Sequence, residues 1–211
     1  LSTDNLEFDD VNRGEQPQAT LYLFNAGKKD YSPELMHLPK YLSAYADPEV
    51  IRPGRMGKLI ITLNSNEVRS FGLTQTNIYL SRFSGDRVGT DNELGTAVTL
   101  LPHFTESEQR NPAAPKAEIP TSIDLGSFGT KQELKGTLLL TNRGQSPLKV
   151  SMLQVYKRGI SVSLSKGTLK PGASAKLRVT VSQSSEAERG NPRILLITND
   201  PQLPKITIEV K

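Results

Sequence analysis

The sequence predicts an all-β protein of two tandem antiparallel β-sandwich domains, and three observations lead to this prediction. Two pairs of segments are near copies of each other: residues 20–27 return as 137–144, and residues 51–63 return as 169–181. Apolar residues alternate with polar ones in short runs, and turns containing glycine and proline separate these runs. Because each copy spans about 100 residues, the repeated unit is a complete domain and not a solenoid repeat.

The alternating runs supply the expected strands of each domain. In the first copy the alternating apolar positions are Leu21/Leu23, Leu59/Ile61/Leu63, Ile78/Leu80 and Val98/Leu100. In the second copy they are Leu138/Leu140, Leu148/Val150, Val162/Leu164, Leu177/Val179/Val181 and Ile206/Ile208/Val210. Successive side chains of a strand point to opposite faces of the sheet, so each set of alternate positions is expected to line one core.

Two kinds of turn divide these strands. Pro53-Gly54 and Pro171-Gly172 place a residue with fixed φ before a glycine, which predicts a type II turn. Asn25 and Asn142 each stand two residues before a glycine, so we expect the asparagine side chain to bond its own backbone and the glycine to be left-handed. Short strands and such turns over about 100 residues indicate the immunoglobulin type of sandwich. The tryptophan and paired cysteines typical of antibody domains are absent.

A polar segment with Pro112 and Pro115 separates the two copies. It has neither a helical nor a strand period of apolar residues, so it is interpreted as a partly extended linker. The predicted organisation is therefore domain 1 over residues 1–104, a linker over 105–118 and domain 2 over 119–211.

Composition excludes several classes of site. The chain has no cysteine, which excludes disulfides, thiolate metal sites and cysteine nucleophiles. Its longest aliphatic runs fall far short of the roughly 20 residues that cross a bilayer. The chain begins at Leu1 without a methionine or an apolar leader, so we expect any signal sequence or lipid anchor to lie upstream.

Charge is distributed unevenly between the two domains. Residues 1–104 carry 10 basic and 13 acidic side chains, whereas residues 119–211 carry 14 basic and 6 acidic ones. The basic second half fits an anionic partner, and it fits equally a lysine-rich solvated surface that keeps sheet edges from associating. No interleaving of arginine with aromatic residues indicates nucleic-acid binding, so no nucleic-acid partner is predicted.

The sequence carries no recognisable catalytic constellation. The two histidines, His37 and His103, have neither zinc-ligand spacing nor an evident nucleophile beside them. Phosphate-binding loops, dinucleotide-binding glycines and a nucleophile elbow are absent from the sequence. We therefore expect a non-enzymatic protein without catalytic residues, metal ligands or cofactors. A hydrolase would need two carboxylates that converge from different strands.

The two copies differ most at two segments of domain 1 that we interpret as insertions. Residues 31–48 contain three of the six tyrosines, and residues 82–95 extend a loop where domain 2 has only residues 199–204. Residues that match between the copies serve mainly the shared fold, whereas binding residues tend to lie on loops. Function is therefore expected in these two segments.

Seven residues of domain 1 form the candidate binding site: Tyr41, Tyr45, Tyr79, Arg82, Phe83, Asp86 and Arg87. The four aromatic residues fit a platform for a sugar ring or a peptide, or else ordinary core and edge packing. The two arginines fit pairing with a carboxylate or phosphate of a ligand, or else bonds to nearby backbone and to Asp86.

A calcium site is the third possibility in this loop. Asp86, Asp91 and Glu93 supply carboxylate oxygens, although Arg87 lies among them and the spacing differs from that of an EF-hand. The alternative is a solvated loop whose glycines provide its turns. No metal ligand is predicted on this spacing.

Several motifs resemble the DUF1573 family of immunoglobulin-like domains of Bacteroidetes. The Asn-x-Gly and Pro-Gly turns carry this resemblance in both copies, and domain 1 adds more specific segments at 38–42, 72–76, 79–83, 85–88 and 100–102. The resemblance implies an exported protein of the envelope of a Gram-negative gut or oral bacterium. Many relatives carry a Cys-Gly-Cys element that this chain lacks, so no redox or metal role is transferred from them.

The sequence thus predicts a non-catalytic, exported binding, adhesion-type or structural module of the cell envelope. Its partner would be a protein or a surface glycan, recognised through the loops of domain 1. Two immunoglobulin-like domains in about 210 residues also match the size of periplasmic pilus chaperones, which act by strand donation, and this is the alternative.

Overall fold

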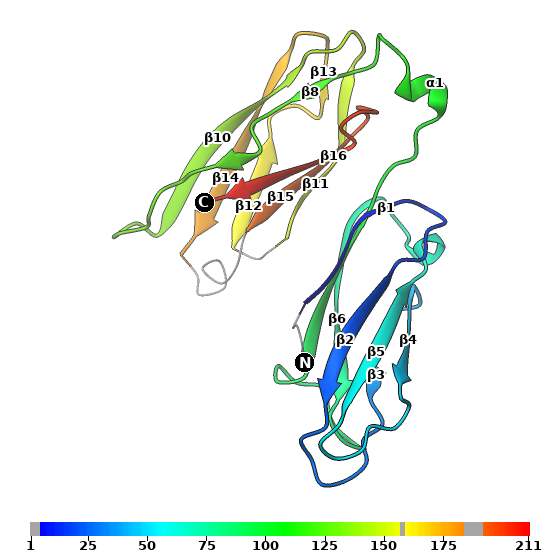
Figure 1. Cartoon of the computed structure of the whole chain (residues 1–211). Helices are drawn as coiled ribbons and strands as arrows, with labels where there is room; N and C mark the ends of the chain where they lie inside the picture. The colour runs from blue at the N-terminus through cyan, green and yellow to red at the C-terminus, as the bar shows by residue number, and fades with distance from the viewer. Residues whose placement is uncertain (1–4, 157–158, 184–191) are drawn as a thin grey trace. The chain divides into compact units, whose positions relative to one another are not determined.

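The computed structural model describes residues 5–156, 159–183 and 192–211, and it divides the chain into two compact units (Figure 1). The units are residues 1–100 and 101–211, close to the predicted domains. Each unit is a sandwich of two β-sheets around its own hydrophobic core. The predicted all-β class with two immunoglobulin-like sandwiches is confirmed.

The described part of domain 1 contains seven strands in two sheets. One sheet has the order β1-β7-β6-β3 and the other the order β2-β5-β4. The strands are β1 (Asn5–Val11), β2 (Gln18–Phe24), β3 (Glu34–Met36), β4 (Leu42–Asp47), β5 (Met56–Leu63), β6 (Gly72–Ser81) and β7 (Glu93–Leu100). β1 pairs with β7 in parallel, and the other pairs are antiparallel. A 3₁₀ turn, η1 (Ser65–Glu67), follows β5.

Domain 2 repeats this plan with two additional short strands. Its sheets have the orders β12-β14-β10-β8 and β13-β11-β15-β16-β9. The strands are β8 (Ala117–Glu118), β9 (Ser122–Ile123), β10 (Glu133–Asn142), β11 (Leu148–Val155), β12 (Ile160–Leu164), β13 (Thr168–Leu169), β14 (Ser174–Ser182), β15 (Arg193–Thr198) and β16 (Lys205–Val210). β10 corresponds to β2 and β14 to β5, as the repeated motifs require.

The predicted alternating positions all lie on strands and face the cores. All of those in domain 1 are buried, and in domain 2 Leu138, Val150, Val162 and Leu164 are partly buried against the core while the others are buried. β1 and β15 were not among the alternating runs. β1 contributes Leu6 and Phe8 to the first core, and β15 is buried on both faces. A strand that is covered on both faces lacks the alternation of apolar and polar residues from which strands are predicted.

The two repeated turns of domain 1 meet at one buried side chain, Asn25. Its Nδ2 donates to the carbonyls of Ile51 at 2.7 Å and Lys29 at 2.8 Å. Its Oδ1 accepts from the backbone N–H of Gly27 at 2.9 Å, and its own carbonyl accepts from Gly54 at 2.8 Å. One asparagine therefore ties the Asn-x-Gly turn to the Pro-Gly turn.

Asn142 forms the same network in domain 2. Its Nδ2 donates to the carbonyls of Leu169 at 3.0 Å and Ser146 at 2.8 Å, and its Oδ1 accepts from Gly144 at 2.9 Å. Its carbonyl accepts from Gly172 at 2.8 Å. Gly54 and Gly172 both have positive φ, which confirms the predicted Pro-Gly turns.

The left-handed conformation predicted for Gly27 and Gly144 is wrong, because neither residue has a positive φ. Close packing explains Gly144 instead. A Cβ there would overlap the carbonyl oxygen of Ala114 and would lie 2.5 Å from the nitrogen of Lys116. At Gly27 a Cβ would meet only the Oδ1 of Asn25, at 3.1 Å.

The predicted linker contains regular structure. Residues 106–109 form the single helical turn α1 (Glu106–Gln109), which Thr105 and Glu108 close with a capping box. Ala117 and Glu118 form β8, which pairs with the end of β10 and so belongs to domain 2. The capping side chains provide helix donors with partners although the segment has no apolar period.

The interpretation of residues 31–48 as an insertion is wrong. The segment carries β3 and β4, which correspond to β11 and β12 of domain 2. Asn25 and Pro53 are 28 residues apart, and Asn142 and Pro171 are 29 apart, so the two copies have nearly equal length here. The tyrosine-rich composition had suggested a loop. Of the second predicted insertion, residues 82–95, the last three residues belong to β7, and the extended loop before them is described below.

Replacing Asn142 by alanine is expected to lower the free energy of unfolding of domain 2 by about 2–3 kcal/mol. The substitution leaves buried carbonyls without donors, and each unsatisfied group costs about 1–3 kcal/mol. Chemical denaturation followed by domain 2 amide signals measures the change. Thr20→Ala, on the exposed face of domain 1, is the control. A loss below about 0.5 kcal/mol, as at an ordinary surface site, would contradict this role.

The two matching glycines are expected to respond differently to substitution. Gly144→Ala should destabilise domain 2 by about 1–3 kcal/mol, because the new methyl group overlaps fixed backbone. Gly27→Ala should change the stability of domain 1 by less than Gly144→Ala changes domain 2. Thermal unfolding of both variants tests this, and equal losses would show that the space beside Gly27 is also filled.

Candidate binding site in domain 1

The loop between β6 and β7 distinguishes domain 1 from domain 2. In both domains a backbone hydrogen bond closes the base of this loop: Leu80 N–H donates to Asn92 O, and Thr198 N–H donates to Pro204 O, both at 2.9 Å. Eleven residues lie between the bonded positions in domain 1 and five in domain 2. The loop of residues 81–91 is therefore six residues longer than its counterpart, and we call it the long loop.

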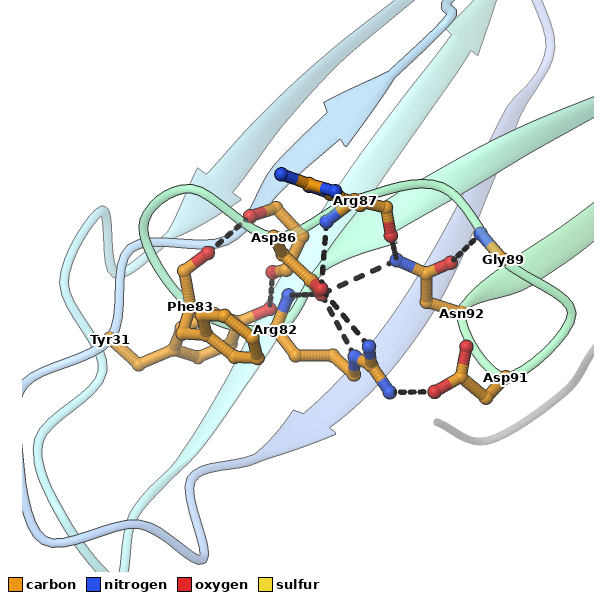
Figure 2. Close-up of polar contacts among 9 residues, drawn as sticks. Tyr31, Arg82, Phe83, Asp86, Arg87, Gly89, Asp91 and Asn92 are labelled. Atoms are coloured by element: carbon orange, nitrogen blue, oxygen red, sulfur yellow. Dashed lines mark hydrogen bonds and ion pairs between the residues drawn. The ribbon is translucent and has the colours of Figure 1, made fainter.

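Asp86 organises the long loop (Figure 2). Its Oδ2 accepts from the backbone N–H of Arg82 at 2.9 Å and from Nε at 2.8 Å, and its Oδ1 accepts from Nη2 at 3.0 Å. The backbone N–H of Arg87 donates to Oδ1 at 2.9 Å, and Nδ2 of Asn92 donates to Oδ2 at 3.3 Å. The Nη1 of Arg82 also pairs with Asp91. One carboxylate thus joins both ends of the loop.

These bonds determine the electrostatics of the loop. The Asp86 side chain is only 3% exposed, whereas that of Arg82 is 42% exposed. Hydrogen bonds from the Arg82 side chain, then from the Arg82 and Arg87 backbone, hold the pKa of Asp86 well below its usual range. The same pairing raises the pKa of Arg82. Both groups remain charged at physiological pH.

Other polar bonds attach the long loop to the sandwich. The Tyr31 hydroxyl donates to the carbonyl of Ser81 at 2.7 Å, and the Ser81 hydroxyl donates to the carbonyl of Phe83 at 2.9 Å. Burial, with a smaller contribution from the Asp86 carboxylate, raises the pKa of Tyr31 to about 12. The loop is therefore held in one shape by groups of its own domain.

A pocket of about 360 Å³ lies between the long loop and the Asn-x-Gly turn. Phe24, Gly27 and Tyr31 line one side, and Arg82 and Asp91 line the other. A second hollow beside it is lined by Lys28, Lys29, Tyr31, Arg82 and Phe83. Arg82 and Tyr31 contribute to both, so this end of domain 1 offers aromatic and charged groups together.

The structure does not bring the four predicted aromatic residues together. Phe83 is 60% exposed on the long loop, with the Arg82 guanidinium 5.9 Å from its ring centre. Tyr79 lies on the outer face of β6 and stacks edge-on with His37. Tyr45 is exposed on β4, in the opposing sheet. Tyr41 packs against the core and lines a different hollow, with Arg13 and Arg69.

The predicted polar residues do gather in one place. Arg82 bonds Asp86, which was one of the two possibilities given for it. The Arg87 side chain extends away from Asp86 (Figure 2), and its guanidinium has no partner among the described residues. Sequence reasoning missed Tyr31, Asn92 and the backbone of residues 24–28 as parts of the site. The sequence signal that could have indicated this part of the site is the Asn-x-Gly turn, which occurs in both copies.

No group of three or more potential metal-ligating side chains occurs within the described residues. Asp86 and Asp91, two of the three suggested calcium ligands, both face the Arg82 cation. In the same part of the chain, no helix has the length and hydrophobicity to span a membrane.

Comparisons with known proteins show the fold. A family model for immunoglobulin-like domains of the HYDIN/CFA65/VesB type matches residues 115–211. Domain 2 is thus immunoglobulin-like by sequence as well as by structure. No curated protein matches the chain. The match names a different family from DUF1573, so the DUF1573 resemblance stays a prediction.

Solved structures resemble both domains. A protein of unknown function from Porphyromonas gingivalis has a TM-score of 0.74 at 21% identity, over 99% of this chain and 96% of that one. The CupB2 chaperone of Pseudomonas aeruginosa scores 0.32 at 11% identity, over 98% and 97% of the two chains. The E. coli chaperone DraB scores 0.32 at 12% identity, over 98% and 94%. The first likeness shows a shared fold, and the chaperone scores are too low to support an argument.

The Asp86 bonds predict a specific pH dependence. Its lowered pKa means that its stabilising effect is present above about pH 4, where free aspartate ionises, and is lost as the pH falls toward the folded-state pKa. Asp86→Asn should lower the unfolding temperature of domain 1 at pH 7, and the gap to wild type should narrow at lower pH. Asp47→Asn, on the exposed face of β4, is the control. A gap independent of pH would contradict the ion pair.

Proposed function

We propose that this protein is a non-enzymatic recognition module, and that it binds a protein partner through the end of domain 1 formed by the long loop and residues 24–31. The observation that carries this proposal is the extended loop itself. It adds six residues to a shared scaffold, and Asp86 holds it in one shape beside a pocket. A loop ordered before binding loses less conformational entropy when it binds.

The composition of the site favours a protein over a glycan. The site presents exposed Phe83, Phe24 and two arginines, and aromatic residues and arginine are enriched at protein interfaces. No tryptophan is present to stack on a sugar ring. The immunoglobulin-like fold in turn suits the display of loops on a rigid scaffold.

The proposed location is the bacterial cell envelope, outside the cytoplasm. The resemblance to DUF1573 implies export, and the fold likeness to a Porphyromonas gingivalis protein is compatible with it. Attachment through a lipid anchor upstream of Leu1 belongs to the same proposal. Strand donation as in pilus chaperones and hydrolysis by a carboxylate pair stay predictions.

The test measures which envelope fraction the purified chain retains. The chain is immobilised and exposed to fractionated envelope proteins and, in parallel, to surface polysaccharides of its host. The matched variant replaces residues 81–91 with residues 199–203, which gives domain 1 the short loop of domain 2. Lys131→Ala, in an exposed turn of domain 2, is the control.

We expect a protein to be retained by wild type and by the control, and to be lost by the short-loop variant. The melting of domain 1 in that variant is recorded to establish that it folds. Retention of polysaccharide alone would contradict a protein partner. Protein retention that survives the loop replacement would contradict the site.

A further inference from the structure

Domain 2 shows what can lie against the Asn-x-Gly turn. Residues 114–118 run beside it as a short added strand. The backbone N–H of Arg143 donates to Lys116 O at 2.8 Å, and that of Gln145 donates to Ala114 O at 3.4 Å. Glu118 continues the pattern by pairing with Thr141. The carbonyl oxygens of alternate residues in the strand thus accept hydrogen bonds from the backbone N–H groups of alternate residues in the turn.

Within the described residues, no strand pairs with the same edge of domain 1. Ala26 and Lys28 match Arg143 and Gln145, and within the described residues neither backbone N–H has a hydrogen-bond partner. Phe24 matches Thr141. The neighbouring Asn25 directs its N–H toward β5, bonding Arg55 O at 3.0 Å, so Phe24 directs its backbone groups the other way. Three successive alternate residues therefore face an edge that has no partner strand among residues 5–156, 159–183 and 192–211.

Space for an added strand is already present. The pocket of about 360 Å³ is lined by residues 23–27 on one side and by Arg82 and Asp91 on the other. Gly144 must lack a side chain because the strand of domain 2 lies against it. Gly27 lacks one too, although only its neighbour Asn25 comes near. Because Gly27 has no side chain, the space that an added strand would occupy stays unfilled.

The side chains beside this edge are more apolar than those at the matching edge of domain 2, as is typical of an interface. Phe24 and Met56 form a cross-strand pair, 57% and 58% exposed, where domain 2 has the hydrogen-bonded polar pair Thr141 and Ser174. Contiguous exposed apolar patches are typical of binding surfaces, and this pair contributes apolar area to the edge. The fold does not require them, because domain 2 forms the same sheet without them.

The charge beside the edge also differs. In domain 2 the Asp200 carboxylate accepts from the N–H of Ala117 in the added strand, at 2.8 Å. The closing bonds of the two loops place Arg82 at the corresponding position in domain 1, where its guanidinium is already paired with Asp86 and Asp91. Lys28 and Lys29 are exposed nearby and have no ion-pair partner among the described residues. The open edge therefore suits a strand that carries carboxylates.

We propose that domain 1 binds an extended segment of a partner protein as an added antiparallel strand on the free edge of residues 24–28. The backbone carbonyls of the segment accept from Phe24, Ala26 and Lys28, its apolar side chains lie beside Phe24 and Met56, and an acidic side chain faces Lys28 and Lys29. Main-chain bonds of this kind provide affinity, and flanking side chains provide specificity. The inference rests on the proposed function, since it names the kind of partner that this site takes.

The test uses two synthetic peptides and the full chain. One peptide has the sequence of residues 111–119, which is the strand that domain 2 accommodates, and the other has glutamate at the position of Lys116. Titration is followed by NMR of the backbone amides. We expect shifts and slowed hydrogen exchange at Phe24, Ala26 and Lys28, tighter binding of the glutamate peptide, and a smaller difference between the peptides at high salt.

Gly27→Val is the blocking variant, since its side chain would occupy the path of the strand. Thr20→Ala, at an exposed position of β2, is the control. The spectrum of the free variant shows whether it is folded. If it is not, Gly27→Ala replaces it, with a weaker but measurable loss expected. The proposal is supported if the peptide-induced amide shifts are lost in the Gly27 variant and retained in Thr20→Ala.

Two results would overturn the inference. One is the absence of amide shifts at Phe24, Ala26 and Lys28 at millimolar concentration of both peptides. The other is slowed hydrogen exchange at these amides only when the peptide sequence is fused to the N-terminus of the chain. That result would show that the added strand comes from the same polypeptide and not from a partner. Retention of an envelope protein that depends on the long loop but not on Gly27 would refute the strand and leave the proposed function in place.

Discussion

Each domain depends on a buried asparagine, Asn25 in domain 1 and Asn142 in domain 2. A buried amide that lacks partners is costly, so the chain must bring it two acceptors and at least one donor. Asn25 takes its acceptors from Lys29 and Ile51, and Asn142 takes them from the matching Ser146 and Leu169. The asparagine thereby links the end of one strand to the Pro-Gly turn that precedes β5 or β14. Since these strands belong to the sheet that carries the free or covered edge, the same contact positions the turn on which recognition depends.

Much of the fold could be predicted because its signals are local. Alternation placed Leu59, Ile61 and Leu63 on one face of a strand, and proline before Gly54 required a positive φ. The errors have a common physical origin. The need for glycine at position 144 comes from a strand almost 30 residues earlier in the chain, so no local rule reveals it. The tyrosine-rich segment 31–48 has exposed outer faces and short strands, whose weak alternation resembles a loop.

The site could be predicted in part for the same reason. Arg82 and Asp86 are four residues apart and lie in one loop, so their pairing is a local event that the sequence indicates. Tyr31 reaches the loop from 50 residues away through the Ser81 carbonyl, and this contact accompanies the long-range pairing of β3 with β6. The aromatic residues show the opposite limit. Tyr45 and Tyr79 each stand between two apolar residues, but they point outward from opposing sheets because β4 and β6 belong to different layers.

The comparison of the two domains separates what stability requires from what binding requires. In domain 2 the donors at the Asn-x-Gly turn are bonded within the chain, and the flanking pair of Thr141 and Ser174 is polar. In domain 1 the long loop satisfies its own carboxylate internally, whereas the backbone of Ala26 and Lys28 and the rings of Phe24 and Phe83 face outward. Exposed donors bonded to water cost the free domain little, so leaving them open does not weaken the fold. The loop is already ordered, and the edge has no partner strand among the described residues. An added segment can therefore form main-chain hydrogen bonds without reorganising the domain.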